Sequence, residues 1–376
     1  MPLHALDDIG DAIDATKSLL VPVQFWQWLK LALVVFFIGG GGAGINSIQN
    51  VNGSGPSGQP SGPDQGFQLV GYLDGLLAPL DAVVLQTTGT DLPPEAQRLL
   101  AGAGLALLAG VVILLLLFLL YAFLSNFMEF VFVESLIERE VHVRRYFGGN
   151  LGNGLRLFGF RLSLDVVSLL AVAVLVYVVL VPVLGVELAN PGTIDGGVIV
   201  RALALLSIPF FLGIVLLGLI TGFTNVFVVP LMLQGDHGIV RGWRRLLASM
   251  TDAPKQYLAY LLFSVVLTIG VALFSVILIG IVGVMLLIPF GIVAALFWVV
   301  LGEGVTAFVL TGLVLAVWAL LVFGVSLFVQ VPLQSFLRYY AMLVLGDIDT
   351  AMDPIPEVRA DIRADGGDAS AAVESG

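Results

Sequence analysis

Long stretches without a charged residue alternate along the chain with short charged segments. An apolar stretch at 25–45 is followed by uncharged intervals over 99–128, 166–186, 202–235, 256–302 and 304–337. A helix rises about 1.5 Å per residue and needs about 20 residues to cross a hydrocarbon core about 30 Å thick, so each interval can span a bilayer. The pattern predicts an all-α fold, a polytopic bundle of transmembrane helices. Its six spans are expected near 25–45, 99–124, 164–186, 202–232, 256–281 and 304–335, within a membrane domain that covers 23–345.

The longest uncharged interval, 256–302, is too long for a single crossing. Fully helical, it would reach roughly 70 Å, more than twice the thickness of the hydrocarbon core. Gly280, Gly283 and Pro289 favour a bend. The sequence therefore predicts one full span here, followed by a partial or re-entrant helix over 284–301.

The basic residues predict how the spans are oriented. With six crossings, the 16 Lys and Arg residues all fall on the side that holds both termini, except Arg98 and Arg201. Basic residues accumulate on the cytoplasmic side of a membrane protein. Both termini are therefore predicted to be cytoplasmic, in a multi-pass protein of the cell membrane.

Two segments outside the spans are predicted to be amphipathic helices. Residues 1–22 carry apolar side chains at helical spacing opposite Asp7, Asp11 and Asp14, which is typical of a helix on the cytoplasmic surface. A second, basic interfacial helix is expected in the loop after the fourth span. Its apolar face comprises Ile239, Val240, Trp243, Leu246, Leu247 and Met250. We expect the acidic face of the first helix to dock on the arginine-bearing loops.

Two further segments are predicted to be flexible. Residues 46–92 form an external loop that begins with a Gly/Ser/Pro/Asn/Gln-rich run, and Asn52 lies in an Asn-Gly-Ser glycosylation sequon there. Residues 346–376 are rich in acidic side chains and predict a disordered cytoplasmic tail.

Composition narrows the possible functions. Hydrophobic residues make up 59% of the 376 residues and charged residues 11%, and the mean hydropathy is +1.04; soluble proteins carry about 25% charged residues. A net charge of −11 argues against nucleic acid as a partner and is typical of proteins that work in high salt. The absence of cysteine excludes disulfides and thiolate metal sites.

Polar and charged residues near the cytoplasmic ends of the spans are the candidate functional groups. Five arginines in the loops are expected to contact lipid headgroups: Arg144, Arg145, Arg241, Arg244 and Arg245. Asn126, Thr224 and Asn225 either join helices by hydrogen bonds or line a cavity. Glu129 and Glu134 are placed within reach of the arginines between 139 and 145. The glycine pair Gly218 and Gly222 favours close helix packing.

Enzymatic chemistry is not predicted. His4, His142 and His237 have no partner at a metal-ligand spacing, so neither a metal nor another cofactor is expected. The spans contain no paired acids and no Ser/Lys or His arrangement, so no catalytic residues are assigned. The protein is predicted not to be an enzyme.

Three segments carry a resemblance to a known family. The segments ALDDIGDAID at 5–14, FWQWLKLALVVFFIGG at 25–40 and LRYYAMLVLGD at 337–347 resemble a family of uncharacterised multi-pass membrane proteins of halophilic archaea, a domain of unknown function. The pattern of amphipathic loop helices more distantly resembles the membrane domain of some glycerophosphodiester phosphodiesterases. No hydrolase domain accompanies it here, so that likeness implies no phosphodiesterase activity.

Two functions remain open from the sequence. A non-enzymatic membrane scaffold or lipid-interacting protein, with membrane lipids as its partners, is favoured by the basic loop faces. The alternative is a small-molecule or lipid transporter or a channel-like protein, with a cavity between two related halves. The shortage of charge inside the spans disfavours ion-coupled transport.

Overall fold

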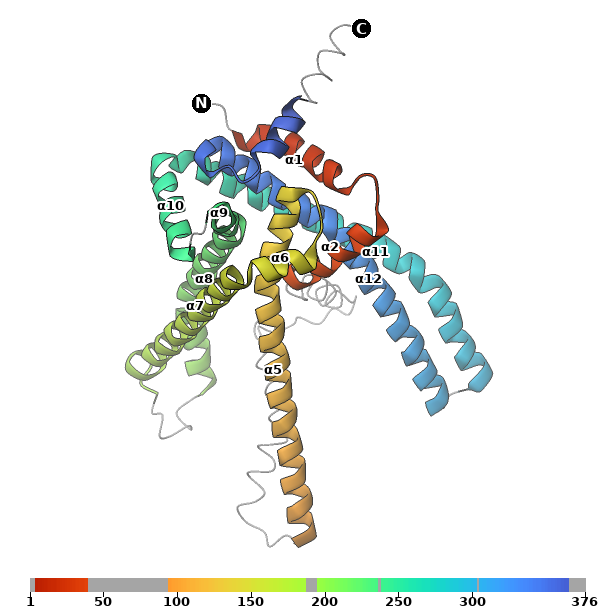
Figure 1. Ribbon diagram of the computed structural model, residues 1–376. Coiled ribbons are helices and arrows are strands. Elements are labelled where there is room, and N and C mark those ends of the chain that lie inside the picture. The colour runs from red at the N-terminus through yellow and green to blue at the C-terminus, as the bar shows by residue number, and fades with distance from the viewer. Residues whose placement is uncertain (1–3, 40–93, 187–194, 236–237, 303, 365–376) are drawn as a thin grey trace. The chain divides into compact units, whose positions relative to one another are not determined.

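The computed structural model describes residues 4–39, 94–186, 195–235, 238–302 and 304–364, and all regular secondary structure in these residues is helical. The α-helices are α1 (His4–Leu20), α2 (Phe25–Ile38), α5 (Pro94–Glu138), α6 (Val143–Gly149), α7 (Leu151–Val178), α8 (Gly196–Phe223), α9 (Val229–Gln234), α10 (Ile239–Asp252), α11 (Pro254–Leu301) and α12 (Val305–Ile348) (Figure 1). Two π-helical turns, η2 (Val179–Val183) and η4 (Thr224–Val228), continue α7 and α8, and a 3-10 turn, η5 (Thr350–Met352), precedes a last helix over 356–364. The chain divides into two compact units, 1–47 with 123–376 and 48–122.

Five helical segments are long and apolar enough to cross a membrane. They are Ala106–Glu138, Leu151–Val183, Gly196–Gln234, Pro254–Leu301 and Val305–Ile348. The expectation of a helical membrane protein with several spans is confirmed. The first predicted span, 25–45, corresponds in part to α2, an apolar helix of 14 residues. At about 1.5 Å per residue α2 reaches about 21 Å, less than a hydrocarbon core, and residues 40–45 lie outside the described residues.

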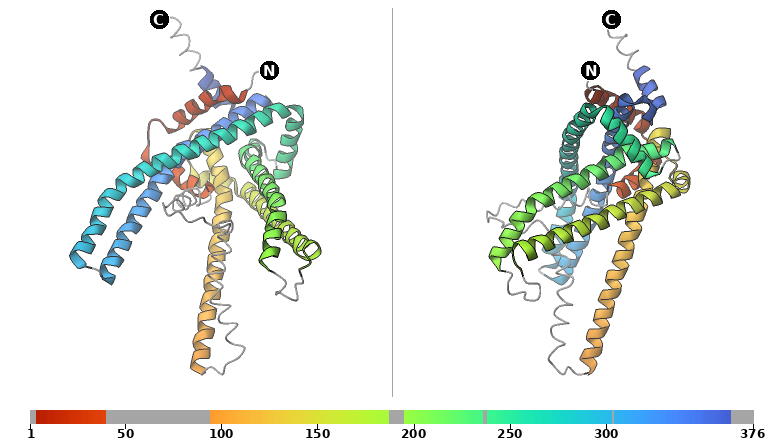
Figure 2. Two further views of the ribbon diagram at one scale, coloured as in Figure 1. Left: turned by 180° about the vertical axis from the view of Figure 1, so that it is seen from behind. Right: turned by 90° about the vertical axis from the view of Figure 1, so that its left-hand side faces the viewer.

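The predicted division of 256–302 into a full span and a separate re-entrant helix is not confirmed, because α11 is one continuous helix of 48 residues. Pro289 lies inside it, and a proline removes one backbone hydrogen bond without ending a helix whose neighbouring bonds remain. The chain reverses only at Gly302, whose φ of 68° suits glycine. The indole of Trp318 on α12 then donates a 3.1 Å hydrogen bond to the carbonyl of Gly283. This bond pins the α11–α12 hairpin, whose helices run side by side in Figures 1 and 2.

Buried residues are concentrated at one end of the long helices. They lie on α5 from Phe127 to Leu136, on α12 from Val331 to Leu345, and on the segment from Phe227 to Met232. In contrast, the most apolar 18-residue windows of the five spans are only 0–11% buried. Within this part of the chain, helix contacts hold the ends of the spans together, and their middles expose leucine, valine and isoleucine. Such surfaces are stable only against lipid tails or another apolar partner.

The C-terminal segment differs from the predicted disordered tail. Residues 346–364 are placed, and Met352, Ile355 and Val358 are buried. The apolar spacing of Ile355, Val358 and Ile362 follows one face of a helix, a signal hidden among the acids of this segment. The remaining tail residues, 365–376, lie outside the described residues.

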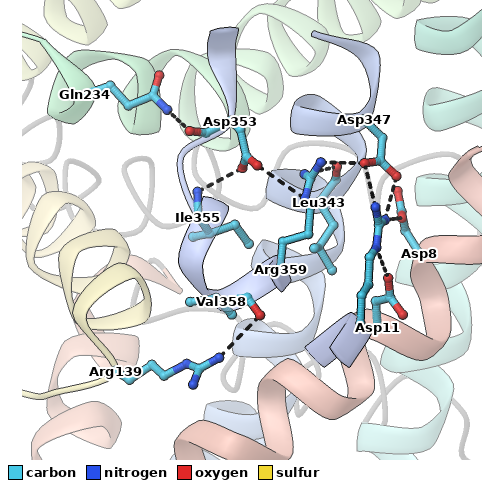
Figure 3. A network of polar contacts seen from close by, with 11 residues as sticks. Asp8, Asp11, Arg139, Gln234, Leu343, Asp347, Asp353, Ile355, Val358 and Arg359 are labelled. Carbon is cyan, nitrogen blue, oxygen red and sulfur yellow. Dashed lines mark hydrogen bonds and ion pairs between the residues drawn. The ribbon is translucent and has the colours of Figure 1, made fainter. Parts of the chain in front are cut away.

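Two arginines of this C-terminal helix hold the termini together (Figure 3). Arg363 contacts carboxylate oxygens of Asp347 at 2.7 Å, Asp11 at 3.0 Å and Asp8 at 3.2 Å. Arg359 pairs with Asp347 and Asp353. The expected docking of α1 on the arginine-bearing loops is therefore wrong, since its acids bind the C-terminal helix. No local sequence pattern indicates this pairing, because Arg363 and Asp8 are 355 residues apart.

The ion pairs between α1 and the C-terminal helix predict that the stability of the folded protein depends on pH. Asp8 is fully buried, and its burial and the neighbouring Asp347 raise its pKa from the ordinary value of 3.8 to about 7. Arg363 and Arg359 oppose that shift. Between about pH 4 and pH 7 the folded state therefore binds more protons than the unfolded state, so this group lowers stability as pH rises, until the effect levels off above pH 7. In the wild type the thermal unfolding midpoint should fall between pH 5 and pH 8, and Asp8→Asn should make that fall smaller. Asp14→Asn, in the exposed pair with Lys17, should leave the slope unchanged, and an equal slope in both variants would contradict the assignment.

Candidate functional site: a buried charged junction and an adjoining cavity

The π turn η4 leaves a backbone carbonyl without a partner from its own helix. The N–H of Val229 donates to the carbonyl of Thr224, five residues back, rather than to that of Asn225. The next nitrogen belongs to Pro230, which has no hydrogen to donate. The carbonyl of Asn225 instead accepts a hydrogen bond from the guanidinium of Arg338 on α12. The π turn and the proline together create a polar site that an arginine from another helix fills.

The same arginine forms a buried ion pair. Its second terminal nitrogen contacts Glu129 on α5, and the side chains of Arg338 and Glu129 are only 8% and 2% exposed. The Arg338 guanidinium also lies 5.8 Å from the ring centre of Phe132. Either charge alone would be strongly unfavourable at such burial, so each requires the other. The expectation that Glu129 would meet the arginines near 139–145 was wrong.

A second arginine completes the junction. Arg161 on α7 donates a 2.5 Å hydrogen bond to the side-chain oxygen of Asn225. Thr224 donates to the carbonyl of Ile220 at 2.6 Å and accepts from the indole of Trp243 on α10 at 3.2 Å. We call Glu129, Arg161, Asn225 and Arg338 the charged junction. It joins α5, α7, α8 through η4, and α12.

The junction adjoins a cavity of about 500 Å³ between α8, α11, α12 and the end of α2. Its polar lining residues are Asn225, Tyr260, Ser264, Thr268, Gln334, Arg338 and Tyr340. Of the three polar residues that the sequence singled out for a cavity, only Asn225 lines it. Asn126 and Thr224 are buried in the packing and are absent from the lining.

Four of the five loop arginines are exposed, and the fifth forms a hydrogen bond to another segment. Arg144 and Arg145 are exposed and line a shallow cavity of about 540 Å³ with Lys30 and His142. Arg241 and Arg244 are exposed on α10. Arg245 is different, because its guanidinium donates a 2.6 Å hydrogen bond to the carbonyl of Ala351 and so ties α10 to the C-terminal segment. The predicted glycosylation residue, Asn52, lies outside the described residues.

The buried face of α10 is narrower than the apolar face predicted from the sequence. Ile239, Gly242 and Leu246 are buried, and a Cβ at Gly242 would lie 2.9 Å from Val228. Val240 and Leu247, which the sequence placed on the apolar face of the same helix, are exposed. The close contact at Gly242 thus determines which face of α10 packs against α9 and η4. Two apolar side chains of α10 remain exposed.

Sequence analysis singled out two of the four residues of the charged junction, Glu129 and Asn225, and missed Arg161 and Arg338. One signal was available: Pro230 follows Asn225 by five residues, which removes a backbone donor near a polar side chain.

These helices and the charged junction define a helical membrane protein whose spans are joined at one end by buried charges. Residues 3–355 match the model of a family of unknown function, DUF7544, and the chain belongs to that family. No curated protein and no solved structure matches the chain.

The junction predicts that Asn225 is structurally demanding. Asn225→Leu removes the acceptor of Arg161 and leaves that half-buried guanidinium without its hydrogen bond, at a cost of about 1–3 kcal/mol. Asn153→Leu is the matched control, because Asn153 accepts a longer, exposed bond of 3.4 Å from Arg156; its effect should stay within about 0.5 kcal/mol. Titration with sodium dodecyl sulfate from mixed micelles measures both. Equal effects would show that Asn225 has no special role.

Proposed function

We propose that this protein is a non-enzymatic scaffold of the cell membrane that binds anionic lipid headgroups on the cytoplasmic surface. The observation that carries the proposal is the outer face of α10. It exposes Arg241 and Arg244 together with Val240 and Leu247, which are 68% and 52% exposed. A helix with basic and apolar residues on its open face suits the boundary between headgroups and acyl chains.

The orientation that follows has six crossings and cytoplasmic termini. The predicted span 25–45, which contains α2, is the first crossing, and the five long helical segments are the others. Lys30, Arg144, Arg145 and α10 then face the cytoplasm, and Arg98 and Arg201 face outside. This distribution of cations follows the positive-inside rule and supports the proposal.

The basic cavity beside α6 supplies a second headgroup site. Lys30 on α2 donates a 3.3 Å hydrogen bond to the carbonyl of Val141, which brings its ammonium group to the base of α6. Arg144, Arg145 and His142 lie around it. Lys30, Arg144 and Arg145 bring three cations to one open cavity and favour a phosphate group there, whereas His142 contacts Glu140 at 3.4 Å.

A transporter is the alternative function. The cavity at the charged junction favours it, because Asn225 and Gln334 place hydrogen-bonding groups between spans. Transport requires a path to both membrane surfaces. Uptake of a polar-headed solute into proteoliposomes, abolished by Gln334→Leu, would favour this alternative over a scaffold.

The scaffold proposal predicts a selective loss of lipid binding. Each basic residue near an anionic surface contributes about 1 kcal/mol, so Arg241→Gln with Arg244→Gln should weaken binding of phosphatidylglycerol roughly 30-fold. Native mass spectrometry of the full-length protein, with phosphatidylcholine as the reference lipid, measures the ratio of bound lipids. The control is Arg98→Gln with Arg201→Gln, which changes the net charge equally at the two cations expected to face outside. The proposal fails if both pairs lower the ratio to the same extent.

A further inference from the structure

Two glycines form part of the wall of the cavity at the charged junction, and no neighbouring helix requires them. Gly218 and Gly222 lie one turn apart on α8 and both line the cavity. A Cβ at either position would meet nothing within 4 Å. The sequence pattern predicted that this pair makes a close helix contact, and that prediction is wrong. Their missing side chains instead widen the cavity on the α8 side.

The rest of the lining combines polar and apolar side chains. Leu219 and Phe223 on α8 lie beside the two glycines, and Leu261 on α11 and Leu337 on α12 are also apolar. Ser264 and Thr268 on α11 and Gln334 on α12 are polar. A cavity lined by apolar side chains, bare helix backbone and hydrogen-bonding groups fits a molecule with a polar head and an apolar chain.

The polar part presents little free charge. The guanidinium of Arg338 is the charged group in the lining, and it is already paired with Glu129 and bound to the carbonyl of Asn225. An added carboxylate or phosphate would compete with Glu129 for the same arginine and lie close to a buried negative charge. An uncharged head that donates and accepts hydrogen bonds meets no such conflict.

The amide of Gln334 is the best placed group for such a head. Its nitrogen donates a long bond of 3.4 Å to the side-chain oxygen of Gln330, which in turn donates to Ser275 at 3.1 Å. This chain of bonds orients the Gln334 amide along α12, one turn before Arg338. Gln334 lines the cavity, and its side-chain oxygen can accept a hydrogen bond.

We propose that this cavity binds a single lipid with an uncharged, hydroxyl-bearing head, such as a monoacylglycerol, with the head at Gln334 and the chain along Gly218 and Gly222. The volume of about 500 Å³ lies in the range of about 300–1,000 Å³ for small-molecule sites. The site shares no residue with the basic surface of α10 or the Lys30 cavity. Lipid binding in this cavity therefore does not depend on anionic headgroup binding at those surfaces.

The test uses the full-length protein in nanodiscs and a monoacylglycerol that carries a diazirine and an alkyne in its chain. Ultraviolet crosslinking and peptide mapping should place the label on α8 and α11 near the cavity. Gly218→Leu with Gly222→Leu fills the cavity, and leucine favours a helix over glycine, so the fold should be kept. Labelling of these peptides should fall about tenfold, equivalent to about 1.4 kcal/mol of binding.

The control variant is Gly213→Leu with Gly270→Leu. Both glycines lie on spans, both have open space for a Cβ, and neither lines the cavity. The control should label like the wild type. Absence of labelling at the cavity in the wild type, or an equal loss in the control, would overturn the proposal.

Two further comparisons test the head. Gln334→Leu should lower labelling by the monoacylglycerol and leave labelling by a diazirine-bearing alkane of the same length unchanged. A diazirine-bearing fatty acid, ionised at pH 8, should label the wild-type cavity less than the monoacylglycerol does. Stronger labelling by the fatty acid would overturn the assignment of an uncharged head, and a Gln334→Leu effect on the alkane would show that the amide acts only through packing.

Discussion

The pairing of Arg338 with Glu129 is the interaction on which the rest of the structure depends. A guanidinium near the end of an apolar span must find an opposite charge and hydrogen-bond acceptors, since its burial is otherwise too costly. Glu129 on α5 provides the charge, and the carbonyl of Asn225 provides an acceptor. Each partner comes from a different helix, so satisfying one arginine fixes three helix ends against one another.

The local sequence of η4 makes that arrangement possible. The π turn and Pro230 deprive Asn225 of a backbone donor, and Arg161 and Arg338 supply donors to its side chain and carbonyl. The aromatic packing around Phe227, Tyr260 and Tyr340 then surrounds the junction, with ring centres 4.9 and 5.8 Å apart. Packing is strong at this end of the helices and weak along the spans, and the open cavity lies at the boundary between the two.

The sequence predicted the features that depend on local pattern. Uncharged length indicated the long helices, and helical spacing indicated α1 and α10. Sequence analysis failed where the structure depends on contacts between residues far apart in the chain. Arg338 and Glu129 are 209 residues apart, and Arg338 and Asn225 are 113 residues apart. Composition misled at the C-terminus, where acids hid the apolar face of 356–364. It also misled at α11, where glycine and proline suggested two separate helices and the structure has one continuous helix. Gly218 and Gly222 matched a packing motif, but only the neighbouring helices determine whether such a motif is a contact or a cavity wall.

A double-mutant cycle on the buried pair tests this account most directly. Glu129→Gln and Arg338→Gln, singly and together, are compared by unfolding of the full-length protein in mixed micelles. The account predicts that each single change costs about 3–5 kcal/mol, because it leaves one buried charge uncompensated, and that the double change costs clearly less than the sum. Additive effects, or single changes below about 0.5 kcal/mol, would show that the two charges do not hold the helix ends together.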